Sequence, residues 1–282
     1  MFPAPFDYRV ASSREEAVAL LAEFGEDARL LAGGHSLVPL MKLRLAEPKV
    51  LIDLGRLRDL AYIQTDNGVV RIGALTTHAK IEWSARLAEV VPLLPEVARV
   101  VGDPQVRNRG TIGGSLAHAD PSADFPAAAL ALEAQLRILG PSGERTVVAS
   151  DFFHGVFTTA LRPDELLVEV VVPLAPEGSG SAYEKFPHPA SGYAVAGVAA
   201  HVGPNGVRVG ITGASTIPYR ARAVEQAVAA NQMFDGIEAA AGLAADGVDL
   251  TEDLFASSAY RAHLVRVCTR RALERAAARS QV

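Results

Sequence analysis

The chain has 282 residues, of which 49% are hydrophobic and 21% charged, and its formal net charge is -5. A mildly acidic surface does not attract nucleic acid or an anionic membrane, so neither is an expected partner. The only cysteine, Cys268, excludes an intrachain disulfide and a cysteine-ligated iron–sulfur cluster within this chain.

Targeting and metal-binding patterns are absent from the sequence. The N-terminus has no basic segment followed by an apolar one, and no apolar run is long enough for a membrane span, so the expected location is the cytoplasm. The histidines show no H-x-x-x-H or H-E-x-x-H pairing, so no metal site is predicted. Cys268 lies in the apolar-periodic run LVRVCTRRAL, which indicates a packed core thiol.

Local patterns predict a mixture of helices and strands. Ser12 and Ser13, each with a glutamate three residues later, predict a capped helix that ends at Gly25. Further helices are expected over 77–101, broken near Pro92 and Pro95, and over about 122–133, 218–230 and 258–279. Strands are expected at 29–34 (strand, then loop), 50–54, 69–75, 135–139, 145–149, 166–174, 182–186, 193–202 and 207–214. A cluster of Pro, Gly and Ser at 173–181 predicts a domain boundary.

Two glycine pairs stand out, in AGGHS (32–36) and TIGGS (111–115). Adjacent glycines allow positive φ and remove the Cβ that holds a ligand away from the main chain. Successive exposed N–H groups suit an anion, and Ser36, Thr111 and Ser115 add hydroxyl donors. Lys42, Arg44, Arg107 and Arg109 flank the loops with positive charge.

This pattern favours a pyrophosphate, or a dinucleotide held from two sides. A side chain at Gly34 or Gly114 is then expected to take the place of the phosphate. The alternative is that each loop is a tight turn that only reverses the chain. The G-x-G-x-x-G, G-K-[ST] and G-x-S-x-G motifs are absent, so a dinucleotide here needs an architecture other than the Rossmann fold or the P-loop.

A resemblance to a known family starts from these loops. The segments AGGHSLVPLMKLR (32–44), IDL (52–54), IGALTTH (72–78), VGDPQVRNRGTIGGSLAHADPSAD (101–124) and YEKF (183–186) resemble the FAD-binding medium subunit of the molybdenum hydroxylases, the group of CO dehydrogenase and xanthine dehydrogenase. The resemblance implies an α+β protein of the vanillyl-alcohol-oxidase or p-cresol-methylhydroxylase type. Two subdomains, about 1–56 and 57–176, would hold an extended FAD. A C-terminal domain, 177–282, would consist of a three-stranded sheet with helices.

The same resemblance implies which residues contact FAD: Ala32, Gly33, Gly34, His35, Ser36, Leu37, Thr111, Gly113, Gly114, Ser115, Ala117, Asp124, Leu161, Lys185 and Tyr193. The first loop would wrap the diphosphate with backbone N–H groups, and Thr111, Gly114 and Ser115 would hold it from the other side.

For most of the remaining residues, a role at the cofactor and an ordinary structural role are both open. Asp124 would bind ribityl or sugar hydroxyls, or act as favourable charge at a helix N-terminus. Leu161 would pack near the flavin. Lys185 would approach the isoalloxazine or be an ordinary exposed lysine, and Tyr193 would cover one ring face or be an ordinary sheet aromatic.

The chain also departs from the family pattern. KFPHPASGY has His188 and Gly192 where the family often has arginine and aspartate, which puts the access of the electron acceptor in doubt. His35 stands in place of a commoner glutamine, and His118 is expected to be structural.

No acid–base pair is evident, so no catalytic residue is predicted. The resemblance implies an oxidoreductase subunit that receives electrons from two [2Fe-2S] clusters on a small partner subunit. A large partner subunit would hold the molybdenum-pterin cofactor, in a dimer of heterotrimers. The flavin would pass the electrons to an external acceptor. Two alternatives are a self-sufficient FAD-dependent oxidase of a small alcohol or aromatic substrate, and a non-catalytic scaffold that has lost its flavin.

Overall fold

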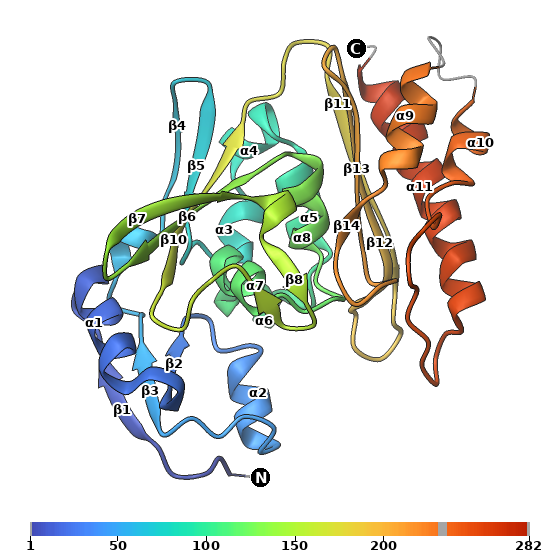
Figure 1. Ribbon diagram of the computed structural model, residues 1–282. Coiled ribbons are helices and arrows are strands. Elements are labelled where there is room, and N and C mark those ends of the chain that lie inside the picture. The colour runs from blue at the N-terminus through green and yellow to red at the C-terminus, as the bar shows by residue number, and fades with distance from the viewer. Residues whose placement is uncertain (1, 231–235, 281–282) are drawn as a thin grey trace.

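A computed structural model describes residues 2–230 and 236–280. Three main sheets, of three, five and four strands, follow one another along the chain (Figure 1). The N-terminal sheet lies at the lower left of the figure, and the long C-terminal helix lies at the right edge. No helix in the described part of the chain is long and apolar enough to cross a membrane.

The N-terminal sheet is parallel, with the strand order β1-β3-β2. Its elements are β1 Asp7–Val10, α1 Arg14–Phe24, β2 Ala28–Leu31, α2 Leu37–Lys42 and β3 Val50–Asp53. Ser13 caps α1 by accepting a bond of 3.1 Å from the N–H of Glu16, whose carboxylate accepts one of 2.7 Å from the N–H of Ser12. This capping box confirms the predicted helix start. Strand β2 runs directly into the first glycine loop.

The second sheet is antiparallel, with the order β4-β5-β10-β6-β7. Its strands are β4 Ile63–Asp66, β5 Val69–Gly73, β6 Gln135–Gly140, β7 Gly143–Val148 and β10 Leu166–Pro173, and a small hairpin joins β8 Phe153–Gly155 to β9 Thr158–Thr159. Between β5 and β6 lie α3 His78–Glu82, α4 Ala85–Val90, α5 Leu93–Arg99, α6 Pro104–Arg109, α7 Ile112–His118 and α8 Phe125–Ala131. Strand β10 contributes side chains to two hydrophobic cores. Val170 and Val172 pack with these helices, while Leu166 and Val168 pack with α1 and the N-terminal sheet.

The third sheet is antiparallel, with the order β11-β12-β13-β14. Its elements are β11 Gly180–Pro187, β12 Ala194–Gly203, β13 Gly206–Thr212, β14 Tyr219–Arg220, α9 Arg222–Ala230, α10 Ile237–Ala241 and α11 Ser258–Ser280. The last three helices cover its outer face (Figure 1). The division at residue 176/177 stays a prediction.

Helix α8 covers the inner face of the third sheet and joins it to the rest of the molecule. A methyl group built on Gly210 would lie 2.1 Å from the carbonyl oxygen of Ala127, so the helix approaches β13 at a distance that only glycine permits. The Thr212 hydroxyl lies 2.8 Å from the carbonyl oxygens of Pro121 and Ala123, just before the helix. The chain at the N-terminal end of α8 is therefore fixed by the C-terminal sheet.

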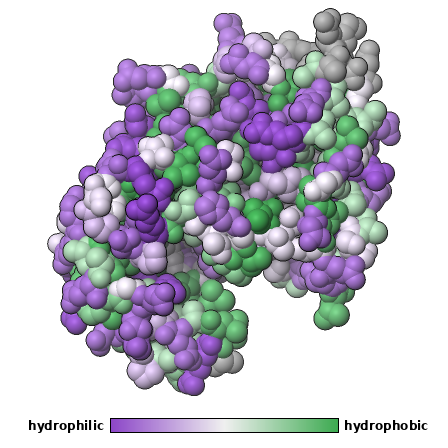
Figure 2. Space-filling view, viewed as in Figure 1, coloured by the Kyte–Doolittle hydropathy of each residue, from purple (hydrophilic) through white to green (hydrophobic). Residues whose placement is uncertain are grey.

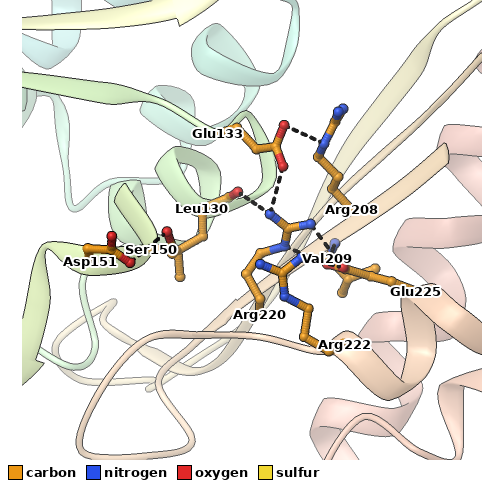
Figure 3. A network of polar contacts seen from close by, with 9 residues as sticks. All are labelled: Leu130, Glu133, Ser150, Asp151, Arg208, Val209, Arg220, Arg222 and Glu225. Carbon is orange, nitrogen blue, oxygen red and sulfur yellow. Dashed lines mark hydrogen bonds and ion pairs between the residues drawn. The ribbon is translucent and has the colours of Figure 1, made fainter. Parts of the chain in front are cut away.

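The C-terminal end of α8 is held by a polar network (Figure 3). Arg220, whose side chain is 8% exposed, forms a bidentate pair with Glu225 at 2.5 and 2.9 Å. Its guanidinium also reaches the carbonyl of Leu130 and the carboxylate of Glu133, and Arg208 pairs with Glu133 at 2.9 Å. Both ends of one helix are thus bonded to the same sheet, which prevents the sheet from shifting along α8.

The predicted segments differ from the observed ones at a few points. The long helix expected over 77–101 is three helices, because Ser84 caps a new start at α4 and Pro92 precedes α5. The helix expected from 218 begins at Arg222, since Tyr219 and Arg220 form a fourth strand that the predicted three-stranded sheet lacked. Cys268 is buried in α11, which confirms the core thiol, and burial raises its pKa to about 11.

Candidate functional site

A cavity of about 460 Å³ lies where the three sheets approach one another. This volume is in the range of sites that hold small molecules and cofactors. Figure 2 shows a notch in the surface between the N-terminal lobe, at the lower left, and the C-terminal domain. All the predicted contacts except Lys185 line the cavity: Ala32, Gly33, Gly34, His35, Ser36, Leu37, Thr111, Gly113, Gly114, Ser115, Ala117, Asp124, Leu161 and Tyr193.

The two glycine loops touch each other directly. A methyl group built on Gly33 would lie 2.2 Å from the carbonyl oxygen of Arg109 and 2.8 Å from Cα of Gly110. One built on Gly114 would lie 3.9 Å from Cβ of Ala32. Residues separated by about eighty positions in the sequence therefore form one wall of the cavity.

The first loop presents a row of free donors. In residues 2–230 and 236–280, no acceptor contacts the backbone N–H groups of Gly33, Gly34, His35 and Ser36. Gly34 has φ 76°, a left-handed conformation that favours glycine and turns successive N–H groups toward one side. Uncompensated donors beside a cavity suit a ligand that carries negatively charged oxygen atoms.

The second loop offers hydroxyls instead. Its N–H groups are already bonded: that of Ile112 to Thr76, that of Gly113 to Ala74, and that of Gly114 to the Thr111 hydroxyl. The hydroxyl of Ser115 has no partner among the described residues, and that of Thr111 keeps its own proton available for donation. The expectation that both loops offer main-chain donors is thus met by the first loop alone, because the second opens helix α7 and its amides serve the fold.

The expectation that a side chain at Gly34 or Gly114 would take the place of a phosphate stays a prediction, and the structure adds a further constraint at each of these glycines. A methyl group on Gly34 would point between Leu31 and Val38, both at 3.2 Å, so conformation rather than space requires glycine there. A methyl group on Gly114 would lie 2.8 Å from the Thr111 hydroxyl. Among the glycines of the two loops, Gly33 and Gly113 are the positions where a side chain would collide with a neighbour's main chain, that of Arg109 for Gly33 and that of Ala74 for Gly113.

Asp124 belongs to a buried polar cluster at the start of α8. Its carboxylate accepts bonds from the Tyr183 hydroxyl at 2.7 Å and from Nζ of Lys185 at 2.8 Å. Burial raises the pKa of Asp124, and Lys185 and the Tyr183 hydroxyl oppose the rise. Burial and the neighbouring carboxylate hold the pKa of Tyr183 far above its usual value.

Lys185 does not line the cavity, and its role toward a flavin stays a prediction. Its side chain is 6% exposed and is held between Asp124 and the carbonyl of Val100 at 3.0 Å, so it is not an ordinary exposed lysine. Any influence on a bound ligand passes through Asp124, which faces the cavity.

The loop between β11 and β12 closes one side of the cavity. Tyr193 is 42% exposed and lines the wall beside Ser191 and Gly192. His188 fixes the loop, because its N–H donates to the carbonyl of Tyr193 at 2.7 Å and its ring packs on Phe255 at 4.4 Å. The imidazole Nδ1 of His188 also accepts bonds from the N–H groups of Ala190 at 3.2 Å and Ser191 at 3.3 Å, and the effect of this departure on acceptor access stays a prediction. His118 packs similarly against Phe157 at 4.9 Å.

His78 also lines the cavity, and the sequence patterns did not select it. It is 4% exposed, its ring stacks on Phe125 at 4.9 Å, and its Nδ1 is buried without a partner among the described residues. Burial lowers its pKa to about 4, so the imidazole is neutral near pH 7. A single histidine within an apolar helix start gives no spacing signal that distinguishes it from a core residue.

Comparisons with protein families cover nearly the whole chain. Residues 4–175 match the family described as the FAD-binding domain in molybdopterin dehydrogenase, and residues 181–276 match the CO dehydrogenase flavoprotein C-terminal domain.

Individual relatives agree over their full lengths. The carbon monoxide dehydrogenase medium chain of Hydrogenophaga pseudoflava is 39% identical, over 99% of this chain and 99% of the relative. The alpha subunit of the 6-hydroxypseudooxynicotine dehydrogenase complex of Paenarthrobacter nicotinovorans is 38% identical, over 100% of this chain and 97% of the relative. A solved structure of Hydrogenophaga pseudoflava carbon monoxide dehydrogenase superposes with a TM-score of 0.95 at 41% identity, covering 99% of both chains.

The loop contact predicts the effect of Gly33→Ala. The new methyl group must displace Arg109 and Gly110, and overpacking of this kind costs about 1–3 kcal/mol, which separates the two loops. We expect the purified variant to bind FAD at least roughly tenfold more weakly, measured by fluorescence titration. Gly155→Ala, whose methyl group would meet only Thr158 at 3.6 Å, is the matched control. Equal affinities in the two variants would show that the loop contact does not support the site.

The buried imidazole predicts a dependence of stability on pH. The folded-state pKa of His78 is about 4, below the ordinary value of 6.5, so the unfolded chain binds more protons between these values and stability falls as pH falls. Between about pH 7 and about pH 4.5 this one group removes about 2 kcal/mol from the free energy of unfolding.

The measurement is urea denaturation of the flavin-free wild type and of His78→Leu at both pH values. The variant should lose less stability than the wild type on acidification, and His201, which also has a lowered pKa, is present in both proteins and cancels. The same loss in both proteins would contradict a neutral, buried His78.

Proposed function

We propose a function from one premise: the chain belongs to the FAD-binding medium subunits of CO dehydrogenase-type molybdenum hydroxylases. The family consists of oxidoreductase flavoproteins, and its members are subunits of multi-subunit dehydrogenase complexes. What remains to be proposed is how this chain holds FAD, from where it takes electrons and to where it passes them.

The cavity fits a dinucleotide that carries a diphosphate. The free N–H groups of Gly33, Gly34, His35 and Ser36 would bind the diphosphate oxygens from one side. The hydroxyls of Thr111 and Ser115 would donate to it from the other side. This row of unsatisfied donors beside two hydroxyls is the observation that supports the proposal most strongly.

The two ends of the dinucleotide would meet different surroundings. Leu161, Leu166 and Leu167 make one part of the wall apolar, which suits a planar ring system. Asp124, which lines the cavity, would bind sugar or ribityl hydroxyls, and Tyr193 would cover an isoalloxazine face at the loop between β11 and β12. The neutral His78 offers one more donor or acceptor.

FAD, when bound, supplies the electron-carrying chemistry. The chain's own residues bind and orient it, and the buried ion pair of Lys185 and Asp124 holds Asp124 in place beside the cavity. In this proposal the chain receives electrons from the iron–sulfur clusters of a small subunit. It passes them to an external acceptor, within a dimer of heterotrimers whose large subunit binds the molybdenum-pterin cofactor.

A self-sufficient oxidase is the alternative function. It would need a substrate pocket with acid–base groups next to the flavin. Two carboxylates that line the cavity are engaged in ion pairs, Asp124 with Lys185 and Glu165 with Arg145. This arrangement favours an electron-transfer subunit.

The experiment is anaerobic mixing of the FAD-loaded chain with the chemically reduced iron–sulfur partner subunit, followed by flavin absorbance. We expect the flavin band to bleach on mixing and to return when an acceptor is added. We also expect the isolated chain to oxidise no small alcohol or aromatic compound. Turnover of such a compound by the isolated chain would favour the oxidase, and a chain that purifies and remains without flavin would favour the scaffold.

A further inference from the structure

A second pocket, of about 210 Å³, adjoins the cofactor cavity. Ala32 and Thr111 line both hollows, so the two glycine loops form part of the wall of each. The second pocket is also lined by Arg58, Lys80 and Arg109, and by the polar side chains of Thr77 and Asn108. The family resemblance implies FAD contacts for Ala32 and Thr111 and names no ligand for Arg58, Lys80, Thr77, Asn108 or Arg109.

Three exposed basic residues, with no acidic partner in the described part of the chain, line this pocket. Arg58, Lys80 and Arg109 come from three separate segments, and the lining contains no aspartate or glutamate. Within residues 2–230 and 236–280 none of the three side chains forms an ion pair or a hydrogen bond. Cations that share a pocket repel one another, and an anion between them removes this repulsion.

The carboxylates near these residues in the sequence are engaged elsewhere. Asp59 pairs with Arg14 at 3.2 Å, and Glu82 pairs with Arg107 at 2.7 Å. Asp53 accepts bonds from the Tyr8 hydroxyl and from the N–H of Gly55. These three carboxylates are therefore not partners of the basic residues around the pocket.

We propose that this pocket binds a phosphate-type oxyanion. Two guanidinium groups and an ammonium group match the charge of phosphate, and the Asn108 amide and the Thr77 hydroxyl supply further donors. The volume is below the roughly 300 Å³ at which sites for drug-sized ligands begin, which favours orthophosphate or the phosphate end of a phosphomonoester over a whole nucleotide. The proposal concerns a site beside the flavin nucleotide and does not depend on the route of the electrons.

The occupant would lie next to the contact between the loops. Arg109 contributes its side chain to this pocket and its carbonyl oxygen to the packing against Gly33. An anion held by Arg109 would restrain that residue, and with it the position of the second loop.

Isothermal titration of the FAD-loaded full chain tests the proposal. The probes are orthophosphate and methyl phosphate, with sodium chloride at matched ionic strength as the blank. We expect one saturable site for at least one probe while the flavin absorbance stays constant. Tighter binding of orthophosphate would indicate the free ion as the ligand, and tighter binding of methyl phosphate would indicate a phosphomonoester.

Arg58→Gln and Lys80→Gln, which lie outside the cofactor cavity, should each weaken this binding by roughly tenfold. Lys49→Gln is the matched control, because this side chain is 75% exposed, away from the pocket, and pairs with Asp27 at the surface. The control should bind phosphate as the wild type does.

Three results would overturn the proposal: no saturable heat with either probe, the same affinity in all three variants, or binding to the flavin-free chain alone with FAD as a competitor. The last result would assign phosphate to the diphosphate position of the cofactor cavity. It would leave the proposed flavin function intact while removing the second site.

Discussion

The packing of Gly33 against the main chain of Arg109 and Gly110 is the constraint on which the cofactor site depends. It brings the end of a parallel strand, β2, against the loop before helix α7, and so joins the N-terminal sheet to the antiparallel sheet. Only a residue without a Cβ permits this approach, since a methyl group would lie 2.2 Å from a carbonyl oxygen. The cofactor cavity and the second pocket both lie at this junction.

The two loops contribute unequally because they belong to different elements. The second opens α7, so its amides bond to Thr76, Ala74 and the Thr111 hydroxyl and hold the helix in place. The first leaves its amides free and turns at Gly34. The amides of the second loop are thus held by bonds within the protein, and the amides of the first loop are free to bond a ligand. A site of this kind is organised before the cofactor arrives, which lowers the entropic cost of binding.

Helix α8 links the cavity wall to the C-terminal domain. Asp124 at its start bonds Tyr183 and Lys185 of β11, and the carbonyl of Leu130 at its end accepts from Arg220. The position of Tyr193, which depends on the sheet, is therefore tied to the same helix that presents Asp124 to the cavity.

The sequence predicted most of the strands and most of the residues that line the cavity. The features that it did not predict depend on contacts between distant parts of the chain. The glycine pairs, the capping box of α1 and the long strands have local signals. The family resemblance selected the residues from Ala32 to Leu37, which the structure places in the lining of the cavity. The engagement of the second loop's amides depends on Thr76 and Ala74, which approach only in the folded chain. The same holds for Lys185, whose pairing with Asp124 spans 61 positions, and for His78, whose burial no periodicity indicates.

The most direct test of the central claim is the change in backbone amide proton and nitrogen shifts when FAD is added to the flavin-free chain. Bonds to diphosphate oxygens should move the amide protons of Gly33, Gly34, His35 and Ser36 strongly downfield, while those of Gly113 and Gly114 should move little. Unchanged amide chemical shifts in the first loop, with large changes elsewhere, would contradict the proposed binding of the diphosphate by these four N–H groups.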